Sequence, residues 1–355
     1  MKNNFFWLAL LVVIFLSGCN VQTTGLSGSK NTVAKIDGGV WKSIDSGNVW
    51  NQSVAIATTN NKSSSIGNTD IKKIIFDPLD HQALYAVTKS DGVVYTYDAG
   101  ASWRQFALPV GHFYSFTVSP KNKCQLYTLV DNKIYQSVDC GRTWQNSYFH
   151  QEKDVYLSDI AINKSNPSIL FLGTSNGNIL RSINGGQSWS VLYRIKNAQI
   201  VDFIQDPNDN NVIYVATKNS GLYKTLDGGA SWRSLGDGLK SYSGSSEYYT
   251  LVIDKATPGG LILVSKFGIL KSTDGGISWI IIDLVPGSQS TSIETLAVNP
   301  QNSKEIYYTT SDSLVKTIDG GVTWSSHKLP FDRSAPCIAI DPVNPKVVYL
   351  CAFKK

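Results

Sequence analysis

Three carboxylates stand at matching places in a repeated pattern, and they are the residues best placed to do acid–base chemistry. Asp159, Asp202 and Glu294 each come four or five residues before an Asp or Asn that begins a turn. Hydrolysis of a glycosidic bond requires two carboxyl groups about 5–10 Å apart in an open cleft. No other catalytic constellation accompanies them, so a non-catalytic protein is the first interpretation and a carboxylate-pair glycosidase is the alternative. Equivalent places in other repeats hold Lys73, Ser115 and Thr250.

Aromatic residues gather around the same places and favour ligand binding. Tyr, Phe and His are frequent in the longer, irregular connections and their flanks, which span residues 54–69, 235–247 and 282–291. Aromatic rings around an acidic, hydrogen-bonding centre would suit a sugar or a peptide. Tyrosines at strand edges also occur without any ligand, and that alternative stays open. The predicted ligand face comprises Tyr114, Tyr156, Arg194, Tyr248 and Tyr249.

Nothing in the sequence predicts a metal, a cofactor or a nucleic-acid partner. The histidines fall in different repeats without metal-ligand spacing; they are His81, His112, His150 and His327. Nucleophile elbows, phosphate loops and paired-cysteine metal motifs do not occur in the sequence. The net charge of +5 is mild, and no Lys/Arg run accompanies it.

A tryptophan motif recurs seven times and identifies the elements that must position these residues. It reads [Ser/Thr]-x-[Asp/Asn]-x-Gly-x-[Ser/Thr/Val]-Trp, and we call each copy a Trp box. The copies follow one another at intervals of 41 to 53 residues. A period of that size is typical of a repeat architecture. The boxes end at Trp50, Trp103, Trp144, Trp189, Trp232, Trp279 and Trp324.

Every residue type of the Trp box has a structural task. The glycine allows a positive φ in a tight turn between two strands. The acidic residue can accept hydrogen bonds from backbone N–H groups of its own turn. The tryptophan buries a large ring at the start of the next strand. We therefore predict structural roles for Asp45, Asp98, Asp139, Asn184, Asp227, Asp274 and Asp319.

A second motif alternates with the Trp boxes and completes the repeat. It is an apolar run, an Asp/Asn turn and a strand ending near an aromatic residue, as in Phe76-Asp77-Pro78 and Ile340-Asp341-Pro342. This motif also occurs seven times. Four short strands in about 45 residues match one propeller blade. The prediction is an all-β, seven-bladed β-propeller of four-stranded blades.

The ends of the chain predict how the ring closes. The first Trp box, within residues 41–50, has no Asp-Pro half before it, and the last half, within 337–353, has no Trp box after it. Together they make one complete blade from N- and C-terminal strands. That pairing removes open sheet edges. The predicted propeller domain covers residues 38–355.

The N-terminus resembles a bacterial lipoprotein leader. A short basic start, an apolar run over 5–16 and the sequence Leu16-Ser17-Gly18-Cys19 are similar to the lipobox. The resemblance implies a signal peptide over 1–18, lipidation of Cys19 and a flexible tether over 19–37. It places the protein outside the cytoplasm in the bacterial cell envelope, on the outer membrane if the cell has two. An uncleaved membrane anchor is the alternative.

The remaining cysteines form two candidate disulfides. Cys337 and Cys351 lie on strands that flank one Asp-Pro turn, and Cys124 and Cys140 lie on adjacent strands of another repeat. Facing residues on antiparallel strands are close enough for a disulfide. An extracytoplasmic compartment permits such bonds. Four free thiols are the alternative.

The repeats resemble the bacterial neuraminidase, or Asp-box, repeat. That repeat occurs in sialidases, xyloglucanases, the sortilin ectodomain and photosystem II assembly-factor-like propellers. The resemblance covers about nine-tenths of the mature chain. It implies the propeller fold, and it implies that the box acids are not catalytic, because in sialidases the boxes lie away from the catalytic centre.

The activities of the resembled enzymes fit this chain poorly. A sialidase needs three arginines to hold the substrate carboxylate, but only Arg194 and Arg333 lie away from Trp boxes. Xyloglucanases of this type use a cleft between two tandem propellers, whereas this chain has repeats for one. We therefore expect a lipid-anchored, monomeric binding or assembly module for a protein or glycan. A sialidase- or xyloglucanase-like glycosidase and a chaperone for a membrane complex are the alternatives.

Overall fold

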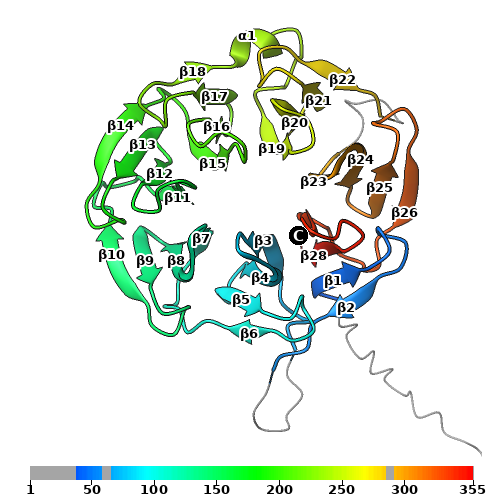
Figure 1. Cartoon of the computed structure of the whole chain (residues 1–355), viewed down its shortest axis with the longest axis horizontal. Helices are drawn as coiled ribbons and strands as arrows, with labels where there is room; N and C mark the ends of the chain where they lie inside the picture. Colours follow the sequence, from blue (N-terminus) through cyan, green and yellow to red (C-terminus); the bar gives the residue numbers. More distant parts are fainter. Residues whose placement is uncertain (1–36, 58–64, 285–291, 355) are drawn as a thin grey trace, which may run out of the picture. The chain divides into compact units, whose positions relative to one another are not determined.

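Each repeat folds into one four-stranded antiparallel sheet, and seven such sheets stand around a central axis (Figure 1). The computed structural model describes residues 37–57, 65–284 and 292–354, which belong to the unit Ile36–Lys355. The predicted signal peptide and Cys19 lie outside the described residues. The seven-bladed, all-β prediction is confirmed.

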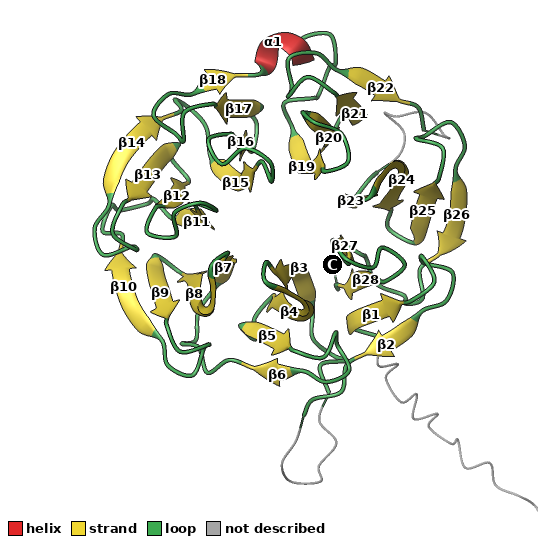
Figure 2. Cartoon of the chain, viewed as in Figure 1, coloured by secondary structure: helices red, strands yellow, loops and turns green. Residues whose placement is uncertain are grey.

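We number the blades along the chain and give their strands from the centre outward (Figure 2). Blade 1 contains β3 (Ile71–Asp77), β4 (Asp80–Thr88), β5 (Val93–Thr96) and β6 (Arg104–Gln105). Blade 2 contains β7 (Phe113–Ser119), β8 (Asn122–Val130), β9 (Lys133–Ser137) and β10 (Gln145–Phe149). Blade 3 contains β11 (Leu157–Ile162), β12 (Leu170–Thr174), β13 (Asn178–Ser182) and β14 (Ser190–Arg194).

The remaining blades follow the same plan. Blade 4 contains β15 (Ile200–Gln205), β16 (Ile213–Thr217), β17 (Leu222–Thr225) and β18 (Arg233–Ser234). Blade 5 contains β19 (Tyr248–Asp254), β20 (Gly260–Ser265), β21 (Gly268–Ser272) and β22 (Ile280–Ile282), and a one-turn helix α1 (Gly236–Leu239) precedes it. Blade 6 contains β23 (Thr295–Asn299), β24 (Asn302–Thr309), β25 (Ser313–Thr317) and β26 (Ser325–Lys328).

Blade 7 joins the two ends of the chain, as the sequence predicts. It contains β27 (Ile338–Ile340), β28 (Val348–Ala352), β1 (Gly39–Ser43) and β2 (Asn51–Ser53). The sheet order β2-β1-β28-β27 places N-terminal strands outside C-terminal ones, with Trp41 opposite Leu350. The Arg333 guanidinium adds ion pairs at this seam, to Asp37 (2.8 Å) and Asp70 (2.7 Å).

The core lies between neighbouring blades. One position on the second strand of every blade is at most 1% exposed, and it is aromatic in six of the seven blades. Several of these tyrosines also donate to the next Trp box, as Tyr127 does to the carbonyl of Gly185 (3.0 Å). Packing and hydrogen bonding therefore both tie blade to blade. The seven residues are Tyr85, Tyr127, Phe171, Tyr214, Ile262, Tyr307 and Tyr349.

The structure pairs Cys124 with Cys140 and Cys337 with Cys351. One placement differs from the expectation, because Cys140 lies in the box turn after β9 and not on the strand. It has a positive φ of 61° there. None of the helices among the described residues is long and apolar enough to cross a membrane.

Candidate ligand-binding site

Five consecutive blades carry a β-bulge at the same place, where the innermost strand begins. The register with the second strand shifts at this point in β3, β7, β11, β15 and β19. Within the described strands, β23 and β27 show no shift where they begin. Bulges turn side chains out of the regular ladder and are frequent next to binding sites. The bulged residues are Lys72, Tyr114, Ser158, Val201 and Tyr249.

All five bulged residues line one cavity of about 370 Å³, which we call the mouth cavity. The Trp boxes join third to fourth strands, so they lie at the other end of the blades from the start of the first strands. The mouth cavity therefore opens on the face opposite the boxes. Because the bulges interrupt the alternation of the strands, the next residues Lys73, Ser115, Asp159 and Asp202 line its wall as well.

Asp159 joins three blades at the base of the mouth cavity. It lies on β11 of blade 3 and is 7% exposed. The Ser115 hydroxyl of blade 2 donates to its Oδ1 (2.6 Å), and the Phe203 backbone N–H of blade 4 donates to its Oδ2 (2.8 Å). Burial and the Asp202 charge raise the pKa of Asp159 to about 6, although Lys73 and these hydrogen bonds oppose the shift.

Asp202 joins the opposite walls of the cavity. The Tyr248 hydroxyl of blade 5 donates to its Oδ2 (3.0 Å), and the Lys73 ammonium of blade 1 lies 3.9 Å from its Oδ1. The Lys73 side chain is 58% exposed, so solvent weakens this ion pair. Burial and Asp202 raise the pKa of Tyr248, and Asp202 also raises that of Lys73. Both carboxylates of the cavity are therefore engaged between blades.

Exposed tyrosines form a platform at the edge of the cavity. The rings of Tyr114 and Tyr156 stack with centroids 5.9 Å apart and planes inclined by 22°. Their exposed fractions are 45% and 37%, and that of Tyr249 is 48%. Large aromatic surfaces held in water at the rim of a cavity are typical of recognition sites. Tyr248, in contrast, is turned toward Asp202.

The charge of the mouth differs from the expected acidic centre. Lys72, Lys73 and Lys218 line the cavity beside its two carboxylates. Three lysines against two carboxylates leave the mouth with an excess of positive charge. The adjacent lysines Lys72 and Lys73, near the start of β3, were the sequence signal for this positive charge. Lys218 follows the second strand of blade 4, and only the folded blade brings it here.

Two predicted residues lie elsewhere. Arg194 ends β14, the outermost strand of blade 3, opposite Asn178, so it does not line the mouth cavity. Glu294 precedes β23 of blade 6 and also lies outside the lining; its backbone N–H donates to the carbonyl of Thr309. Arg194 ends the outermost strand at the same end of the blade as β11 begins, so it lies on the face opposite the Trp boxes but away from the cavity, and its part in ligand binding stays a prediction. Thr250 likewise does not line the cavity.

The acids of the Trp boxes are occupied by their own turns. Asp227 accepts from the Thr225 hydroxyl (2.7 Å) and the Ser231 backbone N–H (2.9 Å). Such bonds lower the pKa of Asp139 to about 2. Asn184 makes the corresponding bonds with Ser182 and Ser188. An amide can therefore replace the carboxylate in this turn.

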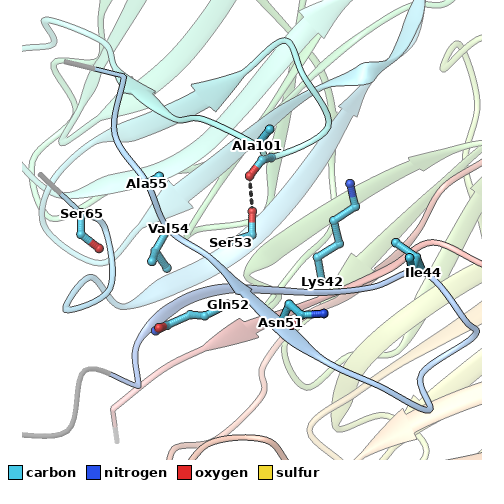
Figure 3. A pocket seen from close by; sticks show the side chains of 10 residues that line it. Lys42, Ile44, Asn51, Gln52, Ser53, Val54, Ala55, Ser65 and Ala101 are labelled. Atoms are coloured by element: carbon cyan, nitrogen blue, oxygen red, sulfur yellow. Dashed lines mark hydrogen bonds between the residues drawn. The ribbon is translucent and has the colours of Figure 1, made fainter. Parts of the chain in front are cut away.

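A larger cavity, of about 540 Å³, lies at the outer seam of blades 7 and 1 (Figure 3). Lys42, Asn51 and Ser53 line it from β1 and β2, as Figure 3 shows. The Lys42 ammonium donates to the carbonyl of Ala99 (2.8 Å), and the Ser53 hydroxyl donates to that of Gly100. These groups hold the two blades together, which makes this cavity a poorer candidate than the mouth.

No cluster of three or more His, Cys, Asp or Glu residues able to hold a metal occurs in the described part of the chain. His81 contacts Asp341 (3.0 Å), His112 contacts Asp131 (3.2 Å) and His150 lies near Glu152 (3.6 Å). These pairs belong to different parts of the ring.

Comparison with known proteins relates the chain to other propellers by fold. No protein-family model matches the sequence, and no curated protein matches it. The chain is similar to the crystal structure of a GH74 enzyme from Niastella koreensis, with a TM-score of 0.64 and 17% identity over 85% of this chain and 53% of that one. It is also similar to the GH74 xyloglucanase from Xanthomonas campestris, with a TM-score of 0.62 and 18% identity over 80% of this chain and 51% of that one.

A third similar structure is YCF48 bound to D1 peptide, with a TM-score of 0.62 and 17% identity. That match covers 84% of this chain and 95% of YCF48. The chain thus spans about half the length of the GH74 enzymes and nearly all of YCF48. At these identities the comparisons establish the β-propeller fold.

Proposed function

We propose that this chain is a non-catalytic binding module that holds an extended segment of a partner protein at the mouth cavity. The observation that carries the proposal is the row of five bulges, which turns Lys72, Tyr114 and Tyr249 toward one cavity. A segment lying across the mouth would meet rings for apolar contact and ammonium groups for acidic or carbonyl oxygens.

Two further points favour a protein segment as the ligand. The mouth cavity, at about 370 Å³, has room for a few side chains and not for a whole folded surface. The YCF48 structure is described as bound to a peptide, and the present chain matches almost its full length as a single propeller. A single propeller that holds a peptide is thus an architecture with a precedent among proteins of this fold.

The proposal includes the predicted cellular address. The lipobox resemblance at Leu16–Cys19 would fix the mature N-terminus in a bacterial membrane and place the propeller in the extracytoplasmic envelope. A module that is tethered near membrane proteins would meet their exposed segments at high local concentration. The Asp-box family membership suggested by the Trp boxes belongs to the same proposal.

A glycosidase is the second candidate, and two observations favour it. Asp159 and Asp202 share one cavity, and the pKa of Asp159 is raised to about 6. However, both oxygens of Asp159 accept bonds from neighbouring blades, and Asp202 is bonded to Tyr248. A general acid or nucleophile needs an oxygen directed at substrate. We therefore expect no release of reducing sugar from xyloglucan, and Asp159-dependent release would make the glycosidase the better proposal.

Site-specific photocrosslinking tests the binding function. A photoreactive phenylalanine replaces Tyr249 at the mouth or, as the matched control, Tyr97 in a Trp box on the opposite face. The exposed fractions of these tyrosines are 48% and 40%. We expect discrete protein adducts in native cells from position 249 and not from position 97. Adducts from position 97 alone, or glycan adducts at 249, would contradict a protein segment at the mouth.

Substitution of the tyrosine platform measures how much it contributes to binding. The double variant Tyr114→Ser/Tyr156→Ser should reduce the adduct at position 249 and weaken binding of the identified segment about tenfold or more, since aromatic anchors contribute about 2 kcal/mol or more at such centres. Both residues are partly exposed, so the propeller should keep its unfolding midpoint. Unchanged binding by a folded double variant would exclude the platform from the site.

A further inference from the structure

The other end of the central channel, on the side of the Trp boxes, holds a second cavity that the proposed function does not use. Its volume is about 240 Å³, and we call it the box-side cavity. It is enclosed by the inner strands and turns of blades 1, 5, 6 and 7. Apart from Lys255, the side chains that line it are apolar and include Phe76, Val252, Leu296, Val298, Ile338 and Ile340.

One cation stands at the edge of this apolar wall. Lys255 lines the cavity from the turn between β19 and β20. In the described part of the chain its ammonium group has no hydrogen-bond or carboxylate partner. The neighbouring acid does not serve it, because the Asp254 carboxylate is buried, accepts from the Ser303 hydroxyl (2.7 Å) and lies 4.0 Å from Lys271.

A second lysine strengthens the positive charge there. Lys164 occupies the equivalent turn position of blade 3, and the other five blades have proline at that position. Its ammonium donates to the carbonyl of Gln205 (3.0 Å). Burial first, and then the charge of Lys255, lower the pKa of Lys164 to about 8. The two lysines are therefore close enough to repel each other at the same end of the channel.

We propose that the box-side cavity binds a small amphiphilic anion, with an aliphatic chain against the apolar wall and an anionic head at Lys255. An apolar pocket with one unpaired cation at its edge complements that combination of tail and charge. A neutral ligand would leave Lys255 unpaired, and a cationic one would be repelled by the Lys255 ammonium. The volume lies below the roughly 300–1,000 Å³ of pockets for drug-sized molecules, so one short alkyl chain is the fitting size.

Calorimetric titration with three ligands of equal chain length tests the proposal. Octanoate carries the anionic head, 1-octanol has no charge and octylamine carries the opposite charge. We expect octanoate to bind at one site per chain, about fivefold more tightly than octanol, because an ion pair at a solvent-exposed lysine contributes up to about 1 kcal/mol. Octylamine should bind more weakly than octanol. No octanoate binding, or equal binding of octanoate and octylamine, would overturn the proposal.

Substitutions in the cavity test the contact with the anionic head and the contact with the aliphatic tail separately. Lys255→Gln should reduce octanoate affinity to that of octanol, whereas Lys346→Gln, an exposed lysine in the corresponding turn of blade 7 that does not line the cavity, should change nothing. Val252→Phe should fill the cavity and abolish binding of both ligands. Octanoate binding that survives Lys255→Gln or Val252→Phe in folded protein would place the ligand elsewhere.

The mouth variant keeps the two sites distinguishable. Tyr114→Ser/Tyr156→Ser should bind octanoate as the wild type does, because the tyrosines lie at the other end of the channel. Loss of octanoate binding in that variant would mean that the amphiphile occupies the mouth, and it would overturn the assignment to the box-side cavity.

Discussion

At the scale of single residues, the same side chain does different work in different surroundings. Aspartates of the Trp boxes are bonded within their own turns, which lowers their pKa values, as at Asp139 and Asp274. Asp159 is buried between three blades, and its pKa is raised. The turn aspartates therefore stabilise the fold as anions, whereas ionisation of Asp159 costs the folded state free energy.

This difference predicts an unusual pH dependence. The pKa of Asp159 is about 6 in the folded protein against an ordinary 3.8, so the folded state holds this proton more tightly than the unfolded chain does. Its contribution to the free energy of unfolding is then full below about pH 4 and is lost as the pH rises through 6. Urea unfolding from pH 4 to 7 should show this decline in the wild type and not in Asp159→Asn.

The box aspartates provide the internal control for that measurement. Their lowered pKa values act in the opposite sense, since their contribution is present above about pH 4 and is lost as the pH falls toward 2. Asp274→Asn should therefore alter the acid limb below pH 4 and leave the region between pH 4 and 6 unchanged. A wild type and an Asp159→Asn variant with parallel profiles between pH 4 and 6 would contradict the raised pKa.

At the scale of elements, a one-residue irregularity decides what the inner strands present. Each bulge places two consecutive residues, such as Ser158 and Asp159, in the wall of one cavity, whereas a regular strand would send one of them to the other face. The described residues of blades 6 and 7 show no bulge where β23 and β27 begin, and none of them lines the mouth cavity. The site is thus confined to part of the ring.

The disulfides belong to the same scale, and blade 7 tests what one of them does. Removing Cys337–Cys351 by a double Cys→Ser substitution should lower the free energy of unfolding by about 2–4 kcal/mol. The two cysteines are 14 residues apart, and a disulfide that closes a loop of about that length restricts the unfolded chain by a comparable free energy. It should also speed hydrogen exchange in β1, which pairs with β28. Removing Cys124–Cys140, with a similar separation of 16 residues, should destabilise comparably without that local effect.

Equal unfolding midpoints of the oxidised wild type and both double variants would contradict this expectation. Thiol counting under native and denaturing conditions, without reductant, provides the check that both bonds form in the purified protein.

At the scale of the whole propeller, the seam between the chain ends carries the closure of the ring. Arg333 lies before β27 and binds Asp37, at the end of the expected tether, and Asp70, which precedes β3. All three side chains are less than one-fifth exposed. One guanidinium thus connects the N- and C-terminal parts of blade 7 with the start of blade 1.

Replacing this arginine should open the seam. Arg333→Met would leave two largely buried carboxylates without this partner, so we expect a loss of about 3–5 kcal/mol in the free energy of unfolding. Hydrogen exchange should rise first in β1 and β28. Arg333→Lys keeps the charge but not the two-pronged geometry and should be intermediate. A Met variant as stable as the wild type would show that strand pairing alone closes the ring.

The number of blades, their order and the closing pairing could be read from the sequence because their causes are local. Turn glycines, box hydroxyls and the period of about 45 residues act within one blade, and the unmatched half-repeats at the two ends require each other. The mouth residues Asp159 and Asp202 could be proposed for the same reason, since equivalent positions in a repeat lie at equivalent places in a ring.

The tertiary structure alone decided the composition of the site. Lys218 directly follows the second strand of blade 4 and reaches the mouth only when the blade folds, whereas Arg194 lies at the end of the outermost strand of blade 3. The bonds from Ser115 and Phe203 that occupy Asp159 cross between blades about 44 residues apart in the chain. Local patterns determine each blade, but contacts across the channel depend on bulges and ring closure, which no single stretch of sequence encodes.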